Sequence, residues 1–357
     1  MTCFYLTRRR YSVLLNNYEN NISNLAKTYN FTIALPESRD PRMIAAWQFL
    51  LKNNAVKRLY LFLSAAELAE DCRRAGFALA PHRHKIIAVK DEIPAIAEKT
   101  LKHIMVLAKN KNKNYPEKDL LTFAGEPLYQ AGFLSASGLC KASVAGAVAT
   151  SAAVIKAGLA TVPLTSGITT LSSSFVMVRS PAQGDDELLL FADCGVVAEP
   201  SSQQLADIAG ASCRTWQALH PGLEPVVAFL SFSTKGSAEH PSLSVVREGL
   251  ALFQHSNPEI VSDGELQFDA AFSAEVGLRK SPRSPVPGKT RIYIFPSLAA
   301  GNIAYKIAER LGGFSAYGPI LQGFSRGFSD LSRGCSPRDI VMSVYYTIIL
   351  NSAGPSE

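Results

Sequence analysis

The sequence predicts an α/β protein, because short apolar runs alternate with segments of helical periodicity along most of its length. The repeated order of strand and then helix favours parallel sheets that helices cover on both faces. With 357 residues the chain exceeds one average domain, so we expect two packed domains, each with its own core. Hydrophobic residues make up 47% and charged residues 18%, a balance that excludes a disordered or fibrous protein.

The predicted strands are five short apolar runs. They are Phe31–Leu35, Leu59–Leu63, Leu188–Ala192, Val226–Phe232 and Arg291–Phe295. Helical patterns follow most of them, and the predicted helices are Arg42–Lys52, Gln203–Ala218, Ser242–Gln254 and Ile303–Leu311. A further apolar stretch, Ala142–Ile155, consists of small residues and is too short to span a bilayer, so we expect a buried helix there.

Residues 1–28 lack this alternation and are rich in Asn, Tyr and Arg. We treat them as an N-terminal extension ahead of the first strand and expect them to be poorly ordered. Within them, Arg8, Arg9 and Arg10 follow a short apolar start, which reverses the basic-then-apolar order of a secretory signal. A cytoplasmic protein without a membrane partner is therefore expected.

Charge and cysteine content narrow the range of partners. The net charge of +6 favours anionic ligands. The lysine run at 109–113 has no interleaved aromatic residues to stack on bases, so we interpret it as a solvated loop and expect no nucleic-acid partner. The six cysteines have no CxxC spacing and the six histidines no HExxH motif, so we expect reduced thiols and no metal site.

The most informative stretch lies near the C-terminus. Ser336 is a good N-cap and Pro337 suits the first helical position, so a helix is predicted to begin there. Ser332, Arg333 and Gly334 would then lie on a loop ahead of a helix N-terminus, where backbone N–H groups, the helix dipole and a guanidinium favour an anion.

Asp339 allows two interpretations from spacing alone. It lies three residues past the predicted cap, so its carboxylate can close a capping box on Ser336. The same carboxylate is equally suited to acid–base catalysis next to the anion-binding loop. Ser332 and Arg333 likewise fit an ordinary hydrogen-bonded turn.

Three other stretches carry polar side chains. The loop after Val226–Phe232 offers hydroxyls, a glycine and Lys235, and is a candidate anion-binding loop although it lacks the P-loop spacing. The carboxylates of Asp263–Asp269 lack a calcium-loop pattern, so we interpret this stretch as a turn. Asn302, Tyr305 and Lys306 open a predicted helix and can face a cleft, although Tyr305 is equally suited to the core.

Five segments resemble the phosphate acetyl/butyryltransferase family in order and spacing. They are ALPESRDPR (34–42), LSFSTKGSA (230–238), DGELQFDAA (263–271), FPSLAAGNIAYKIAERLGG (295–313) and GPILQGFSRGFSDLSRGCSPRDIV (318–341). The resemblance extends from about Thr32 to Asn351 and is strongest after residue 225.

This resemblance implies a fold and a mechanism. The fold would be two α/β/α sandwich domains of the isocitrate and isopropylmalate dehydrogenase type with the active site in the cleft between them. Residues 29–165 and 322–357 would form domain I, and residues 166–321 would form domain II. Asp339 would be the general base that takes the thiol proton of coenzyme A, Ser332 would hydrogen-bond the reacting groups, and Arg333 would hold the phosphoryl group of acetyl phosphate.

The resemblance also implies the substrate contacts and partners. The substrate-binding residues would be Lys156, Ser173, Lys235, Asn302, Tyr305, Lys306, Gln322 and Gly334. Acetyl-CoA, phosphate and acetyl phosphate would be the small-molecule partners, with coenzyme A as a substrate, no further cofactor, and a homodimer as the assembly. The chain departs from the family pattern at Ala149, Ala153 and Lys156, which replace a His, an Asp and an Arg, and an arginine expected near position 109 is missing.

Three alternatives stay open. A non-catalytic relative would bind acetyl-CoA without turnover, but intact Ser332, Arg333 and Asp339 argue against it. A dehydrogenase of the same broad fold would need an acidic metal cluster and a nicotinamide-adenine site, neither of which the sequence indicates. A phosphate butyryltransferase would differ only in the size of its acyl pocket.

Overall fold

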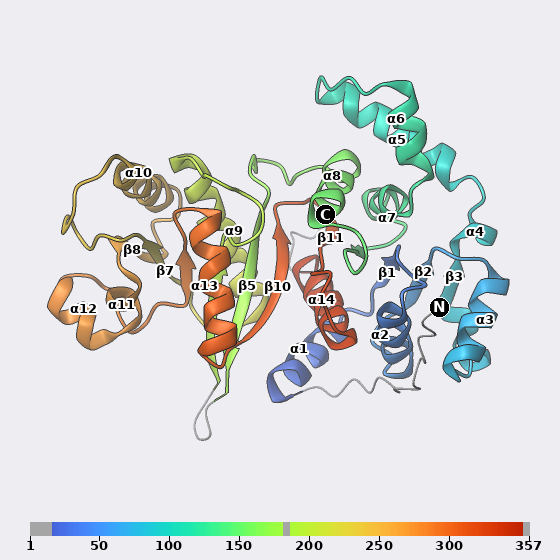
Figure 1. Cartoon of the computed structure of the whole chain (residues 1–357), viewed down its shortest axis with the longest axis horizontal. Helices are drawn as coiled ribbons and strands as arrows, with labels where there is room; N and C mark the ends of the chain where they lie inside the picture. Colours follow the sequence, from blue (N-terminus) through green and yellow to red (C-terminus); the bar gives the residue numbers. More distant parts are fainter. Residues whose placement is uncertain (1–15, 181–185, 353–357) are drawn as a thin grey trace, which may run out of the picture.

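A computed structural model describes residues 16–180 and 186–352 of the chain. Two β-sheets lie side by side with helices around and between them (Figure 1). The α/β class is confirmed.

The first sheet is parallel throughout. Its strand order is β11 (Gly327–Ser329), β4 (Ala142–Val144), β1 (Thr32–Leu35), β2 (Arg58–Leu61) and β3 (Ile86–Ala88). The last strand along the chain, β11, therefore pairs with β4 and forms one edge of the sheet. Strands β1, β2 and β3, which come from the first third of the chain, lie on the other side of β4.

The second sheet is mixed. Its order is β10 (Ser315–Gln322), β5 (Ser172–Arg179), β6 (Glu187–Ala192), β9 (Ile292–Ile294), β7 (Val226–Leu230) and β8 (Val261–Leu266). The pairs β10–β5 and β5–β6 are antiparallel, whereas the other pairs are parallel, so the expectation of parallel sheets holds only in part for this sheet. The sequence prediction missed β5 and β10 because three serines open β5 and a Gly-Pro pair interrupts β10.

Helices cover both faces of the first sheet, as the alternation along β1 requires. Ile33 and Leu35 pack with side chains of α2 (Pro41–Lys52) and α14 (Pro337–Leu350). Ala34 faces the opposite way and packs with α7 (Pro127–Ala136) and the start of α5 (Ile96–Asn110).

The second sheet is covered in the same way. Val227 and Phe229 of β7 belong to the core that includes α9 (Ser202–Leu219) and α10 (Pro241–Ser256). On the other face, Phe175, Phe191 and their neighbours pack with α13 (Leu298–Leu311), near α11 (Phe268–Phe272) and α12 (Ala274–Lys280).

Helix α14 lies between the two sheets and joins their cores (Figure 1). It contacts α2 and β4 on one side, and α9 and β10 on the other. One hydrophobic cluster therefore contains residues of both sheets.

The segment before the first strand is more ordered than expected. Asn17–Lys27 form helix α1, which has a capping box and packs on α14 through Tyr18, Ile22 and Ala26. The expectation of poor order is wrong for this helix, because its apolar face is buried. Residues 1–15 lie outside the described residues.

Two other local predictions are corrected. Ala142–Ile155 is not one helix: β4 comes first, a loop of residues 145–150 follows, and α8 spans Ser151–Thr161. The stretch Asp263–Asp269, interpreted as a turn, is instead the end of strand β8 followed by the start of α11, and Asp263 and Glu265 pair with basic side chains of neighbouring segments.

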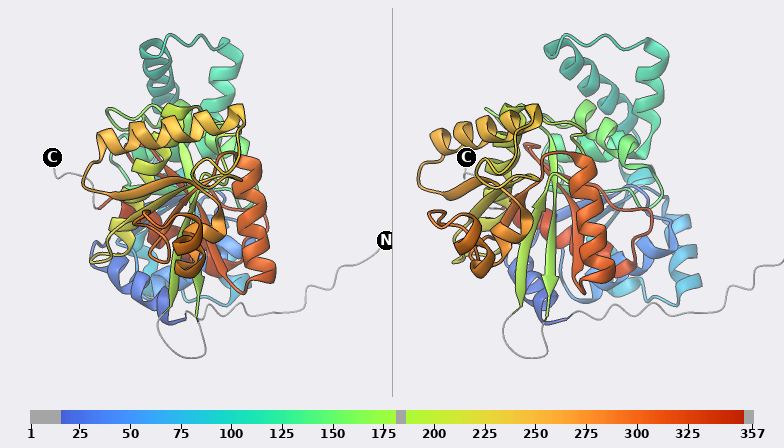
Figure 2. Two further views of the ribbon diagram at one scale, coloured as in Figure 1. Left: turned by 90° about the vertical axis from the view of Figure 1, so that its left-hand side faces the viewer. Right: turned by 60° about the vertical axis from the view of Figure 1, so that its left-hand side comes forward.

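The remaining helices lie between β2 and β4 along the chain. They are α3 (Ala65–Ala75), the short 3-10 helix at Ala80–Lys85, α4 (Val89–Glu92) and α6 (Glu117–Gly125). Helices α5 and α6 project from the body of the molecule (Figure 2). Within residues 16–180 and 186–352, every helix is too short or too polar to cross a bilayer.

Candidate active site

A cavity of about 730 Å³ opens between α13, β10 and the first turn of α14. Seven of the eleven residues predicted for the site line it: Asn302, Tyr305, Lys306, Ser332, Arg333, Gly334 and Asp339. They come from two separate segments, α13 and the motif that leads into α14, so the fold brings together residues that the sequence predicts one motif at a time.

The loop and helix predicted at the C-terminal motif are both present. Ser336 caps α14 and Pro337 occupies its first turn. The capping box is confirmed: the Asp339 amide donates to Ser336 Oγ over 3.3 Å, and Asp339 Oδ2 accepts from the Ser336 amide over 2.8 Å.

Capping does not use the whole Asp339 carboxylate. Oδ2 accepts from the Ser336 amide and hydroxyl, but no hydrogen bond joins Oδ1 to any residue in the described ranges. The side chain is exposed and lines the cavity. One oxygen can therefore fix the carboxylate while the other accepts a proton, so the two interpretations of Asp339 are compatible.

Two cationic side chains of the cavity have no acidic partner in the described part of the chain. Arg333 and Lys306 are both exposed and neither takes part in an ion pair there. The Ser332 hydroxyl accepts the Gly334 amide over 3.3 Å, which leaves its proton free to be donated. Two unpaired cations that share a cavity with a free hydroxyl suit a phosphoryl group.

Helix α13 forms the opposite wall. The Asn302 amide donates to the Cys194 carbonyl over 3.1 Å, and the Tyr305 ring stacks on Phe175 with centroids 4.0 Å apart. Gly301 allows this close approach, because a β-carbon there would overlap the Asp193 carbonyl and lie 3.0 Å from Cys194 Sγ. The packing of this helix sets where Lys306 enters the cavity.

Two cysteines line the cavity but are poor nucleophiles. Burial raises the pKa of the Cys335 thiol to about 11, and burial likewise raises the pKa of Cys194 well above its ordinary value. Since the thiolate is the reactive form, both thiols stay protonated near neutral pH.

Asp330 is a lining residue that the sequence prediction missed. It is only 1% exposed, and neither carboxyl oxygen has a hydrogen bond of normal geometry among the described residues. Burial raises the pKa of this carboxyl to about 6, and the nearby Ser151 hydroxyl offsets only part of the rise. The sequence signal that could have indicated Asp330 is its position two residues before Ser332.

Arg42 was quoted in the family motif without a role. Its guanidinium donates to the carbonyls of Arg333 over 2.6 Å and Cys335 over 3.3 Å, and to the carbonyl of Ala147 over 2.5 Å. The Asp40 carboxylate holds the same guanidinium over 2.9 Å. Arg42 thus ties the loop of Ser332 and Arg333 to the loop before α8.

Four predicted substrate-binding residues lie outside the lining of the cavity. Lys156 stands over the Phe123 ring at 4.8 Å. Gln322 is buried in a network with Thr215, Ser172 and Ser212.

The other two of these four are engaged with carboxylates of the chain. The Ser173 hydroxyl donates to Asp193 over 2.5 Å, and Asp193 also accepts the backbone amides of the loop that contains Cys194 and Gly195. Lys235 pairs with Asp263, and Glu265 accepts the Gly236 amide over 2.8 Å in the loop predicted to bind an anion. Carboxylates of the chain itself therefore bind the groups of that loop that were predicted to bind an anion.

No group of three or more potential metal ligands gathers anywhere in residues 16–180 and 186–352. The five described cysteines are all free, whereas Cys3 lies outside the described residues.

The chain is similar to known proteins over nearly its whole length. Residues 18–348 match the family described as Phosphate acetyl/butaryl transferase. A phosphate acetyltransferase of Paracoccus denitrificans is 38% identical over 91% of this chain and 96% of its own, and one of Treponema pallidum is 35% identical over 89% and 94%. The crystal structure of a phosphotransacetylase from Streptococcus pyogenes superposes with a TM-score of 0.85 at 31% identity, covering 95% of this chain and 99% of that one.

Proposed function

The chain belongs to the phosphate acetyl/butaryl transferase family, and we propose that it is a phosphate acetyltransferase, which interconverts acetyl-CoA and phosphate with acetyl phosphate and coenzyme A. One observation carries this proposal: the unpaired cations Arg333 and Lys306 share a cavity with the free oxygen of Asp339. The cations suit the phosphate, and the carboxylate oxygen suits the thiol.

The proposed reaction is a direct transfer between two bound substrates. Asp339 Oδ1 takes the proton of the coenzyme A thiol, and the sulfur attacks the carbonyl carbon of acetyl phosphate. As the carbon–sulfur bond forms, the carbon–oxygen bond to phosphate breaks and phosphate leaves with the electron pair. Arg333 and Lys306 stabilise the charge that grows on the leaving phosphate, while Ser332 donates a hydrogen bond to the reacting groups.

The state of the cavity cysteines supports a ternary complex. A covalent acetyl-cysteine would need a thiolate, and burial keeps Cys335 and Cys194 protonated. Holding two substrates in one cavity can supply about 7 kcal/mol or more of the acceleration by proximity alone. Coenzyme A is then a substrate, and the chemistry requires no further cofactor.

The wider expectations follow from the same family membership. We propose two sandwich domains of the isocitrate and isopropylmalate dehydrogenase type, with residues 29–165 and 322–357 in one and 166–321 in the other. We also propose a cytoplasmic homodimer. Lys156, Ser173, Lys235 and Gln322 stay predicted substrate contacts, and Ser173 can act through the Asp193 loop at the cavity wall.

The test is formation of acetyl-CoA from acetyl phosphate and coenzyme A, followed by thioester absorbance or by loss of free thiol. Asp339→Asn removes the base but keeps an oxygen that can accept the Ser336 amide, so we expect at least a 100-fold fall in kcat. Ser336→Ala is the matched control, because it weakens the cap by about 1 kcal/mol and removes the hydroxyl bond to Oδ2, but keeps the carboxylate and the bond from the Ser336 amide.

The outcomes separate the candidate functions. Full turnover by Asp339→Asn would contradict the assignment of the base. Binding of acetyl-CoA without turnover by the wild type would favour the regulatory relative. A higher kcat/KM for butyryl phosphate than for acetyl phosphate would favour phosphate butyryltransferase.

A further inference from the structure

The carboxylate of Glu37 accepts four consecutive backbone N–H groups. Oε2 accepts the amides of Gly146 over 2.9 Å and Ala147 over 2.7 Å, and Oε1 accepts those of Val148 over 3.0 Å and Ala149 over 2.7 Å. Consecutive amides that converge in this way form a cradle for an anion. Here the chain fills its own cradle, so the loop of residues 146–149 is fixed and is not open to a substrate phosphate.

That loop lies directly against the catalytic segment. Gly146 has a φ of +107°, and a β-carbon on it would overlap Asp330 Oδ1 and lie 2.7 Å from both the nitrogen and the oxygen of Leu331. Leu331 immediately precedes Ser332 in the cavity. Movement of the loop by even a fraction of an ångström would therefore displace the residues that carry the proposed chemistry.

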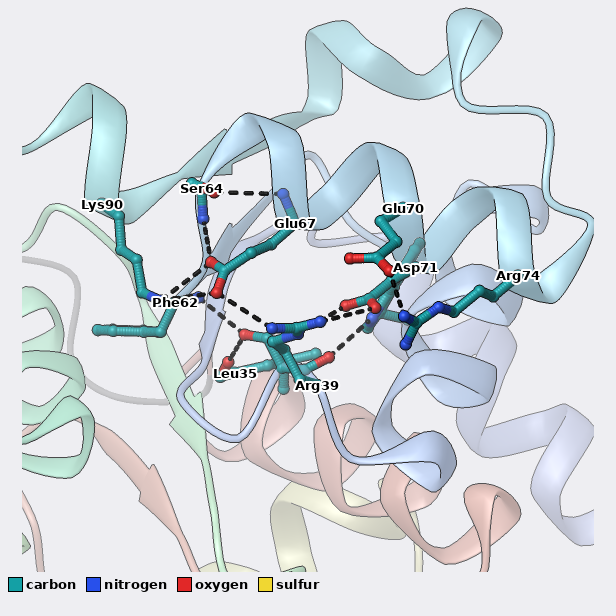
Figure 3. Close-up of polar contacts among 11 residues, drawn as sticks. Leu35, Arg39, Phe62, Ser64, Glu67, Glu70, Asp71, Arg74 and Lys90 are labelled. Atoms are coloured by element: carbon teal, nitrogen blue, oxygen red, sulfur yellow. Dashed lines mark hydrogen bonds and ion pairs between the residues drawn. The ribbon is translucent and has the colours of Figure 1, made fainter. Parts of the chain in front are cut away.

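The segment that contains Glu37 is anchored at Arg39 (Figure 3). Two residues further on, Arg39 makes hydrogen bonds of 3.0 and 3.2 Å to Asp71 and one of 3.1 Å to Glu67, both on α3. Glu67 also takes the ammonium of Lys90 over 2.9 Å. This ion-pair network ties the segment that contains Glu37 to a helix outside the cavity.

We propose that Glu37 is a positioning residue of the active site: through the four amides of residues 146–149 it sets the position of Asp330–Arg333. The expected change in kcat rests on the proposed acetyl transfer, whereas the amide contacts of Glu37 do not depend on it. Glu37 does not line the cavity, so its loss should lower kcat much more than it changes KM.

The decisive variant is Glu37→Gln, because an amide nitrogen would then face two N–H donors. We expect kcat to fall about 10- to 100-fold with KM within about threefold of wild type, since a small misplacement of reacting groups is this costly. Asp71→Asn is the matched control: it weakens the outer anchor at Arg39 but leaves every amide bond of Glu37, and its kcat should stay within about threefold of wild type. Assays run well below both melting temperatures separate positioning from loss of folding.

Hydrogen exchange gives a readout that does not depend on turnover. In wild type the amides of residues 146–149 should be protected, and in Glu37→Gln they should exchange at least 10-fold faster while those of α10 are unchanged. Should Glu37→Gln fail to fold, Glu37→Asp, which keeps the charge but shortens the reach, should show the same local loss of protection.

Equal exchange in the variant and the wild type, or an unchanged kcat in an active enzyme, would overturn the positioning role. A wild type without turnover but with protected amides would instead count against the proposed acetyl transfer.

Discussion

Replacing the buried carboxyl of Asp330 should make the stability of this protein less dependent on pH. An ordinary aspartate has a pKa of 3.8, whereas burial raises the pKa of Asp330 to about 6. The folded state therefore holds a proton that the unfolded state has lost between these values, so stability falls as pH rises from about 4 to about 6. The difference between the two pKa values corresponds to about 3 kcal/mol.

Asp330→Asn carries no charge at any of these pH values. We expect the variant and wild type to be about equally stable near pH 4, and the variant to be more stable by about 3 kcal/mol at pH 7 and above. Urea unfolding at several pH values measures this difference. Asp119→Asn is the control, because Asp119 is exposed and should change stability by less than about 0.5 kcal/mol at every pH. A difference that does not vary with pH would refute the reasoning.

Three further predictions test other parts of the molecule. Burial lowers the pKa of His220 to about 4, so the free energy of unfolding of the wild type should fall by up to about 3 kcal/mol as pH falls from 6.5 toward 4. The His220→Gln variant should not show this loss. Equal urea midpoints for the two proteins at both pH 7 and pH 4.5 would contradict this. Gly301→Ala should push α13 away from the Asp193 carbonyl, which should lower the free energy of unfolding by about 2 kcal/mol in thermal unfolding and raise the KM for acetyl phosphate. Gly125→Ala is the control, because nothing lies near the added carbon there. Lys156→Ala should raise the KM for one anionic substrate about 10-fold and leave kcat unchanged, with Lys156→Arg as the control. An unchanged KM would show that Lys156 does not bind substrate.

The sequence predicted best where local rules decide the structure. The start of α14 follows from Ser336, Pro337 and Asp339, and all three occupy the expected helix positions. The five predicted strands are present because short apolar runs are local signals. In contrast, β5 and β10 were missed because serines open β5 and a Gly-Pro pair interrupts β10, so neither is a continuous apolar run.

The site was predicted only in part for a similar reason. Ser332, Arg333 and Asp339 lie close together along the chain, so one motif indicates them. Asp330 was missed because its lack of partners depends on what surrounds it in the fold. The loop of Lys235 was predicted to bind an anion, but spacing does not reveal that Glu265, far along the chain, occupies it.

The late position of β11 and α14 has a consequence for synthesis on the ribosome. Strand β4 pairs with β1 on one side and with β11 on the other, so one edge of it stays unpaired until residues 327–329 have been made. At about 5–20 residues per second this wait is on the order of ten seconds or more. Throughout it the nascent chain exposes a bare strand edge and the apolar surface that α14 later covers, so we expect it to need a chaperone. A chain whose translation stops before residue 333 would contain neither Arg333 nor Asp339 of the cavity.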